Sequence, residues 1–252
     1  MSFRLQEIIH TIEQGPAYRY LSYVVGIIFF ATVAVFYDSA LYRNLSTIEG
    51  MDAAQLARNL SQGKGYNTDF VRPFSIYLLQ KHRGETNALP EAHPDIANPP
   101  AYPALLAGTL KFMRHDYEIR KGIDKFRIYA PDMWITAVNQ ALFLIAVGVV
   151  FLIARRLFDP SVAWVAAGVV LGTELLWRFT NAGLPTLLLM DLFLGLCWAL
   201  ARIDFLARDA TDTHDRQILF LGVLMGVFLG LGMLTRYSFG WMIVPAIGFQ
   251  TF

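Results

Sequence analysis

The residue best placed to do chemistry is a carboxylate at the start of a one-sided apolar pattern. Asp52 precedes Ala53, Leu56, Ala57 and Leu60, which share one face of a helix that ends at Gly63. A carboxylate held there could accept a proton as a general base. Asp52 and Gln55, three residues apart, would also form a capping pair, which alone would explain an acid at a helix start. The sequence leaves both roles open.

Three arginines near the ends of apolar segments could bind an anion: Arg58, Arg178 and Arg236. A planar guanidinium matches two phosphate oxygens at once. Each arginine could instead anchor its segment among lipid headgroups. Arg178 also lies four residues after Glu174, and this spacing predicts an ion pair on one helix face.

Other candidate groups give weaker patterns. Asp191 lies inside an apolar run, so we expect it to face other helices and to be protonated or paired. Together with the glycine-rich run 222–232 it could line a transport path. His93 and Asp95 could contact a divalent cation or be solvated loop residues. We predict no metal centre and assign no cofactor, the divalent cation being the one candidate; the single cysteine, Cys197, excludes an intramolecular disulfide.

The composition places these residues in a membrane protein. Of the 252 residues 55% are hydrophobic and 16% are charged, whereas a soluble domain carries about 25% charged residues. The formal net charge of +1 gives no electrostatic basis for binding nucleic acid. We therefore predict membrane lipids, and no nucleic acid, as partners.

Apolar runs predict an all-α polytopic fold with about six transmembrane helices. Residues 1–16 have the pattern of an interfacial amphipathic helix, and 17–37 form a first span without a convincing cleavage site. The segment 38–131 is a long polar loop, and 132–252 hold the remaining five spans. The apolar runs are 21–37, 133–154, 161–177, 183–201, 217–235 and 238–252, of which the last is short for a full crossing.

The distribution of arginines predicts the orientation. Seven arginines fall in segments that are cytoplasmic if the N-terminus is inside, against two in the short outer turns. The loop 38–131 is then extracytoplasmic. We expect it to carry two helices lying flat at the surface, one beginning at Asp52 and one after Pro99, Pro100 and Pro103, with an aperiodic stretch over 84–98 between them.

Three segments together resemble the GT-C membrane glycosyltransferases, the relatives of protein mannosyltransferases and lipid A aminoarabinose transferases. The run from Met51 to Leu60, followed by Gly63 and Gly65-Tyr66, is similar to their first outer loop. Asn98 to Ala107 is similar to the family's Pro-Pro-Leu-Tyr-Pro-Leu-Leu-Leu-Ala. Gly222 to Tyr237, which closes on Leu234-Thr235-Arg236-Tyr237, is similar to a later family span.

The resemblance implies transfer of a sugar from a polyprenyl-phosphate carrier to an acceptor at the extracytoplasmic face, in a bacterial inner membrane. Asp52 would be the catalytic base, and Arg58, Arg178 and Arg236 would bind the carrier phosphate. The acceptor and loop region would include Tyr66, Pro99, Pro100 and Tyr102. We expect Asp52, left unpaired, and Arg236 to face one cavity.

A second hypothesis is a non-catalytic subunit of this ancestry that acts as a scaffold with other membrane subunits. Family members are about twice this length, so the chain would correspond to their N-terminal half. They also often place a second acid after the first, where this chain has Ala53. Stoichiometric association with a partner subunit would favour the scaffold.

Overall fold

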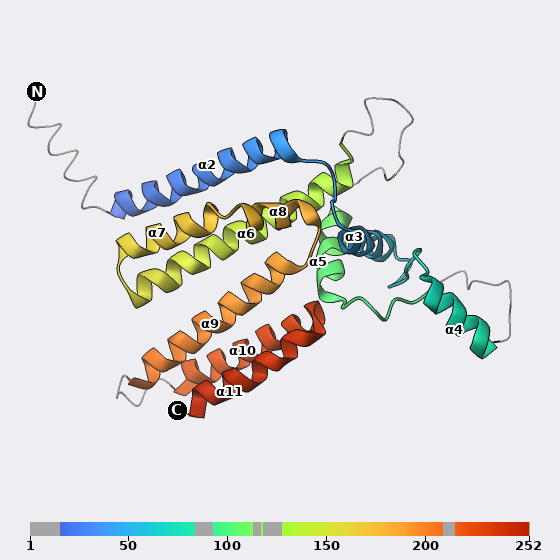
Figure 1. Ribbon diagram of the computed structural model, residues 1–252. Helices are drawn as coiled ribbons and strands as arrows, with labels where there is room; N and C mark the ends of the chain where they lie inside the picture. Colours follow the sequence, from blue (N-terminus) through green and yellow to red (C-terminus); the bar gives the residue numbers. More distant parts are fainter. Residues whose placement is uncertain (1–15, 84–92, 113–116, 118–127, 209–214, 252) are drawn as a thin grey trace, which may run out of the picture. The chain divides into compact units, whose positions relative to one another are not determined.

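The computed structural model describes residues 16–83, 93–112, 117, 128–208 and 215–251 (Figure 1). All regular secondary structure in these ranges is helical, which confirms the predicted all-α fold. The predicted interfacial helix over 1–16 lies outside the described residues, apart from Pro16. The elements are α2 (Pro16–Leu41), α3 (Ile48–Ser61), α4 (Pro73–Arg83), α5 (Ala101–Phe112), α6 (Ala130–Leu157), α7 (Pro160–Leu171), α8 (Glu174–Ala182), α9 (Thr186–Arg208), α10 (Asp215–Thr235), the 3-10 helix η2 (Tyr237–Met242) and α11 (Ile243–Thr251).

The chain divides into two units, residues 1–42 and 43–252. The first unit contains α2, whose 22-residue stretch Tyr20–Leu41 is long and apolar enough to cross a membrane. It corresponds to the first predicted span. The second unit contains all the other described helices and both cavities discussed below.

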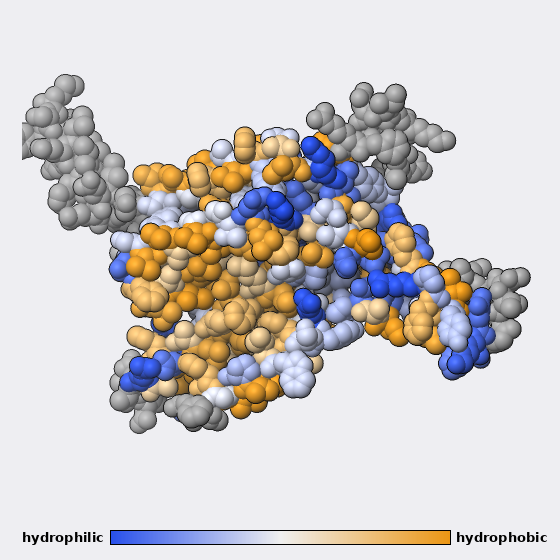
Figure 2. Space-filling model, in the orientation of Figure 1, coloured by the Kyte–Doolittle hydropathy of each residue, from blue (hydrophilic) through white to orange (hydrophobic). Residues whose placement is uncertain are grey.

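Four helices in the described ranges have the length and hydropathy of a membrane span: α2, α6, α9 and α10. The predicted run 161–177 forms α7 and the start of α8, two helices bent by 52° that could count together as a fifth span. The bend falls at Gly172 and Thr173, where the helical hydrogen bonding of α7 ends. Figure 2 shows apolar side chains covering these helices and hydrophilic ones gathered around α3 and α4.

The sixth predicted span does not form one continuous helix. Residues Tyr237–Met242 adopt the tighter 3-10 geometry, and the nine-residue α11 follows, so the apolar helical stretch Tyr237–Phe249 is short for a crossing. Against the prediction of about six spans, the described part of the chain has four helices, or five counting the bent pair, that could cross a membrane. Pro245 has no backbone N–H to donate, so it is tolerated in the first turn of α11 but would disrupt the middle of one long helix over 238–252.

Small side chains bring the bundle helices of the second unit close together. Ala154 on α6 packs against Ala163 and Ala167 on α7. On α9, Gly195 lies against the ring of Phe228 on α10, and a Cβ there would clash with that ring. Close backbone approach through small residues is the usual packing mode of helices in membranes.

Two helices of the long loop cross one end of this bundle (Figure 1). Ala53 and Ala57 of α3 pack with Tyr102 and Leu106 of α5, and Ile135 of α6 completes this buried cluster. These are the two loop helices predicted from the sequence. α4, which begins at Pro73, was not predicted.

A backbone contact fixes α3 on the turn between α8 and α9. The hydroxyl of Thr47 donates to the carbonyl oxygen of Ala182 at 2.6 Å and accepts from the backbone N–H of Gly50 at 3.0 Å. Gly183 follows Ala182 with a φ of 69°, in the left-handed region that favours glycine. A Cβ added to Gly50 would clash with the Ala182 carbonyl, so only glycine lets α3 approach this closely.

We predict that Gly50→Ala lowers the free energy of unfolding by about 1–3 kcal/mol, because the added methyl group forces α3 away from Ala182. Gly108→Ala is the matched control, since a Cβ on this helical glycine of α5 meets nothing within 4 Å. The control should be neutral or stabilise the protein slightly. Thermal unfolding of the two variants in detergent measures the difference. Equal stability of the two variants would contradict the close approach.

Candidate functional site

Asp52 lies in the second turn of α3 and not at its start. The helix begins at Ile48, and its N-cap is Thr47, whose hydroxyl accepts from the N–H of Gly50. The predicted helix start at Asp52 is therefore wrong, and so is the alternative that Asp52 and Gln55 form the capping pair. The N-cap, Thr47, lies five residues before Asp52, which leaves the Asp52 carboxylate available for other contacts.

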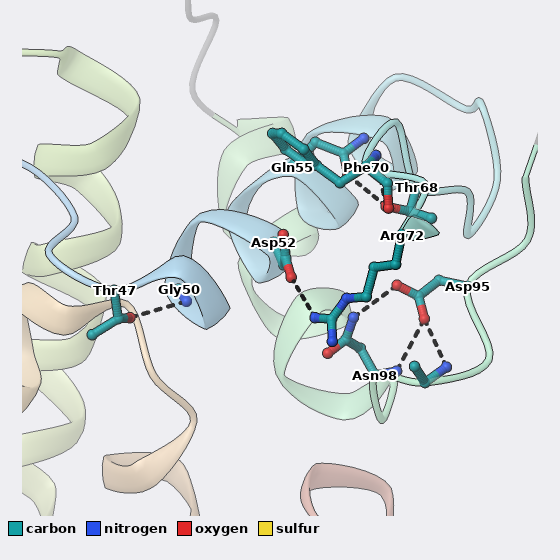
Figure 3. A network of polar contacts seen from close by, with 10 residues as sticks. Thr47, Gly50, Asp52, Gln55, Thr68, Phe70, Arg72, Asp95 and Asn98 are labelled. Carbon is teal, nitrogen blue, oxygen red and sulfur yellow. Dashed lines mark hydrogen bonds and ion pairs between the residues drawn. The ribbon is translucent and has the colours of Figure 1, made fainter. Parts of the chain in front are cut away.

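The Asp52 carboxylate forms an ion pair with Arg72 (Figure 3). A guanidinium nitrogen of Arg72 donates to Oδ2 of Asp52 at 3.1 Å. The Asp52 side chain is 12% exposed and that of Arg72 is 65% exposed. The expectation that Asp52 stands unpaired is wrong. No pattern in the sequence indicated the pair, because Arg72 lies twenty residues away in a segment without a motif.

Two stretches of loop backbone lie beside this pair and line the same cavity. Residues Asn67 and Pro94 form an isolated antiparallel bridge, with Thr68 N–H donating to the His93 carbonyl at 2.8 Å. The Asp95 carboxylate accepts from the backbone N–H groups of Ala97 and Asn98 and from the Asn98 amide (Figure 3). These bonds fix the loop that faces Asp52.

Asp52 lines a small polar cavity of about 70 Å³ between α3 and this loop. The cavity has room for only a few atoms and brings together one cation, two acids and a histidine. Its lining residues are Asp52, Thr68, Phe70, Arg72, Ser75, His93, Pro94, Asp95, Ile96, Ala97 and Asn98. No group of three or more histidine, cysteine or acidic side chains suited to hold a metal ion occurs within the described ranges.

The three arginines predicted to bind phosphate lie at different places. Arg58 faces the ring of Tyr117, 5.9 Å from its centroid, and lines a separate cavity. Arg178 pairs with Glu174 at 2.7 Å on the exposed face of α8, as its spacing predicted. Arg236 follows α10 as the N-cap of η2 and does not line the cavity of Asp52.

Tyr66 connects the loop to the start of α5. Its hydroxyl donates to the carbonyl oxygen of Asn98 at 2.9 Å, with a longer contact of 3.3 Å to that of Pro99. Burial raises the pKa of Tyr66 above its usual range, and the nearby Asp95 and Tyr237 raise the pKa further. Tyr237, the residue after Arg236, therefore comes close to this loop.

Tyr102 lies inside the fold, with 1% of the residue exposed. Its hydroxyl donates to Oδ1 of Asn139 at 3.0 Å, and the Asn139 amide donates to the Thr180 carbonyl at 3.2 Å. This chain of bonds joins α5, α6 and α8. Pro99 and Pro100 are half-buried, and the Pro100 carbonyl accepts from Ala104 in the first turn of α5. The position of Tyr102 supports a structural role, and Tyr66 and Pro99 shape the loop beside Asp52.

These observations define a helical membrane protein with an acid–arginine pair in its largest loop. The sequence model of the family described as dolichyl-phosphate-mannose-protein mannosyltransferase matches residues 128–252. The match confirms the resemblance to GT-C membrane glycosyltransferases. It covers α6 to α11 and includes the third resembling segment, whereas Asp52 and the Pro99-Pro100 segment precede it. No curated protein and no solved structure matches the chain.

We predict unequal stability effects for substitutions of Thr47, the N-cap of α3, and of Asp52 in its second turn. Thr47→Ala should lower the free energy of unfolding by about 1–2 kcal/mol, because it removes the N-cap and the bond to Ala182. Asp52→Asn should change it by less than about 1 kcal/mol, because its partner Arg72 is largely solvated. Thermal unfolding measures both. A larger loss for Asp52→Asn than for Thr47→Ala would show that Asp52 is mainly a structural residue.

Proposed function

We propose that the chain transfers a sugar from a polyprenyl-phosphate carrier to an acceptor at the extracytoplasmic face of the membrane. The observation that carries the proposal is the family match over residues 128–252, whose description names a lipid-linked mannose donor. The arginine distribution that predicts an extracytoplasmic loop 38–131 supports the face, and a bacterial inner membrane remains our prediction for the location.

Asp52 is the proposed catalytic base. Its carboxylate uses Oδ2 for Arg72, and no hydrogen bond to Oδ1 occurs among the described residues. Arg72 thus orients the carboxylate and leaves one oxygen to accept the proton of an attacking acceptor. The adjoining cavity, closed on its other side by the Asp95 turn, is where that acceptor group would enter.

The departing carrier phosphate needs cations, and the structure adds Arg72 to the candidates. A guanidinium has five N–H donors, and Arg72 uses one of them in its bond to Asp52. Its exposure leaves the others accessible to phosphate oxygens. We propose Arg72 as the first phosphate ligand, with Arg58, Arg178 and Arg236 as the candidates predicted from the sequence. The Arg72–Asp52 pair would then place the leaving group and the base in one site.

The alternative is a non-catalytic membrane subunit that acts as a scaffold. It is favoured by one observation, that the family match begins after Asp52 and its loop. A sugar-transfer assay combined with copurification separates the two functions. A wild-type chain that transfers no sugar and copurifies with a membrane subunit in equal amounts would support the scaffold.

We predict that Asp52→Asn lowers sugar transfer at least about 100-fold, because the amide cannot accept the acceptor's proton. Membranes containing the chain are supplied with dolichyl-phosphate mannose or polyprenyl-phosphate aminoarabinose, and release of the carrier phosphate is followed by mass spectrometry. Asp204→Asn is the control, since it makes the same chemical change in an exposed ion pair with Arg208 on α9. This control should retain wild-type transfer. If Asp52→Asn also retains it, Asp52 is not the base.

A further inference from the structure

Two arginines from different helices share one exposed aromatic ring. The guanidinium carbon of Arg156, in the last turn of α6, lies 5.0 Å from the centroid of the Phe205 ring. That of Arg202, three residues before Phe205 on α9, lies 5.8 Å from the same centroid. The packing of α6 against α9 thus brings two like charges together over one ring.

The acids nearest to this pair in the sequence already have partners. Asp204 forms an ion pair with Arg208 at 3.1 Å, and Asp159 accepts from the first backbone N–H groups of α7. Neither Arg156 nor Arg202 forms an ion pair with another described residue. The two cations therefore repel each other without a carboxylate to offset the repulsion, and a bound anion would relieve it.

The arginine pair lies at the end of the bundle opposite the loop helices (Figure 1). Ile135, near the start of α6, packs with α3 and α5. Arg156 lies about 32 Å further along the helix, at about 1.5 Å per residue. This length is close to the hydrocarbon thickness of a bilayer, about 30 Å. A bilayer around α6 would therefore bring its other surface to Arg156, and the arginine distribution predicts that this surface is cytoplasmic.

Apolar side chains surround the two charges. Phe205 is 55% exposed, and Leu157 and Phe158, which follow Arg156, are exposed as well. A soluble anion would leave this apolar surface uncovered, whereas the acyl chains of a lipid would cover it. The guanidinium groups supply several N–H donors for phosphate oxygens. Charge and apolar surface together fit an anionic phospholipid better than a free phosphate.

We propose that Arg156, Arg202 and Phe205 form a binding site for the headgroup of an anionic phospholipid such as phosphatidylglycerol. Its phosphate bridges the two guanidinium groups, and the first carbons of its acyl chains lie along Phe205 and Leu157. The choline group of a zwitterionic lipid would add a third cation, so the site disfavours such lipids. Binding here does not depend on the proposed sugar transfer, because Asp52 and its loop lie at the other end of the bundle.

Native mass spectrometry of the full chain in detergent tests the proposal, with dioleoyl phosphatidylglycerol and dioleoyl phosphatidylcholine as probes. We expect the wild type to bind phosphatidylglycerol more tightly. Arg156→Gln and Arg202→Gln should each weaken phosphatidylglycerol binding about fivefold, the effect of one basic residue near an anionic headgroup, and leave phosphatidylcholine binding unchanged. Thermal unfolding without added lipid checks that both variants fold.

Arg208→Gln is the matched control, since it removes the same charge from α9, but from an arginine that is paired with Asp204. This control should bind phosphatidylglycerol as the wild type does. Equal binding of the two lipids by the wild type would overturn the proposal without any variant. An equal loss in all three variants would also overturn it, because the attraction would then be diffuse. Displacement of the lipid by soluble glycerol 3-phosphate at similar concentrations would contradict a lipid site in favour of a free phosphate.

Discussion

The contact of α3 with the turn between α8 and α9 determines what the rest of the site can do. Thr47 caps α3 and bonds to the Ala182 carbonyl in the same contact, and Gly50 allows the backbones to touch. The contact fixes the rotation of α3 about its axis. Asp52 consequently faces the loop and Arg72, while Arg58 lines the separate cavity.

The loop and the bundle are joined by buried polar bonds as well as by apolar packing. Tyr102, Asn139 and Thr180 connect α5 to α6 and α8, in a region where water cannot replace a lost partner. The family match covers the bundle from residue 128 onward, and the candidate acid lies in the loop before it. These bonds hold the loop helices on the spans, so the matched and unmatched parts of residues 43–252 form one unit.

The sequence predicted the features that depend on local pattern. Long apolar runs gave the four spanning helices, and short one-sided stripes gave α3 and α5. The helix start at Asp52 was wrong because Thr47 and Asp52 are both good capping residues, and the contact with Ala182, 135 residues away, selects Thr47. The Arg72–Asp52 pair could not be predicted, since it depends on how the loop folds back on α3. The break at Tyr237–Met242 shows that an apolar run alone does not ensure one continuous helix.

The central claim is that α3 and Arg72 hold the lipid-linked sugar. A cryo-EM structure of the wild-type chain in lipid nanodiscs with dolichyl-phosphate mannose, and without acceptor, tests it most directly. The account predicts the carrier phosphate within hydrogen-bond distance of Arg72 and the sugar in contact with α3 at Asp52. A donor bound away from α3, with Arg72 touching no phosphate, would contradict it.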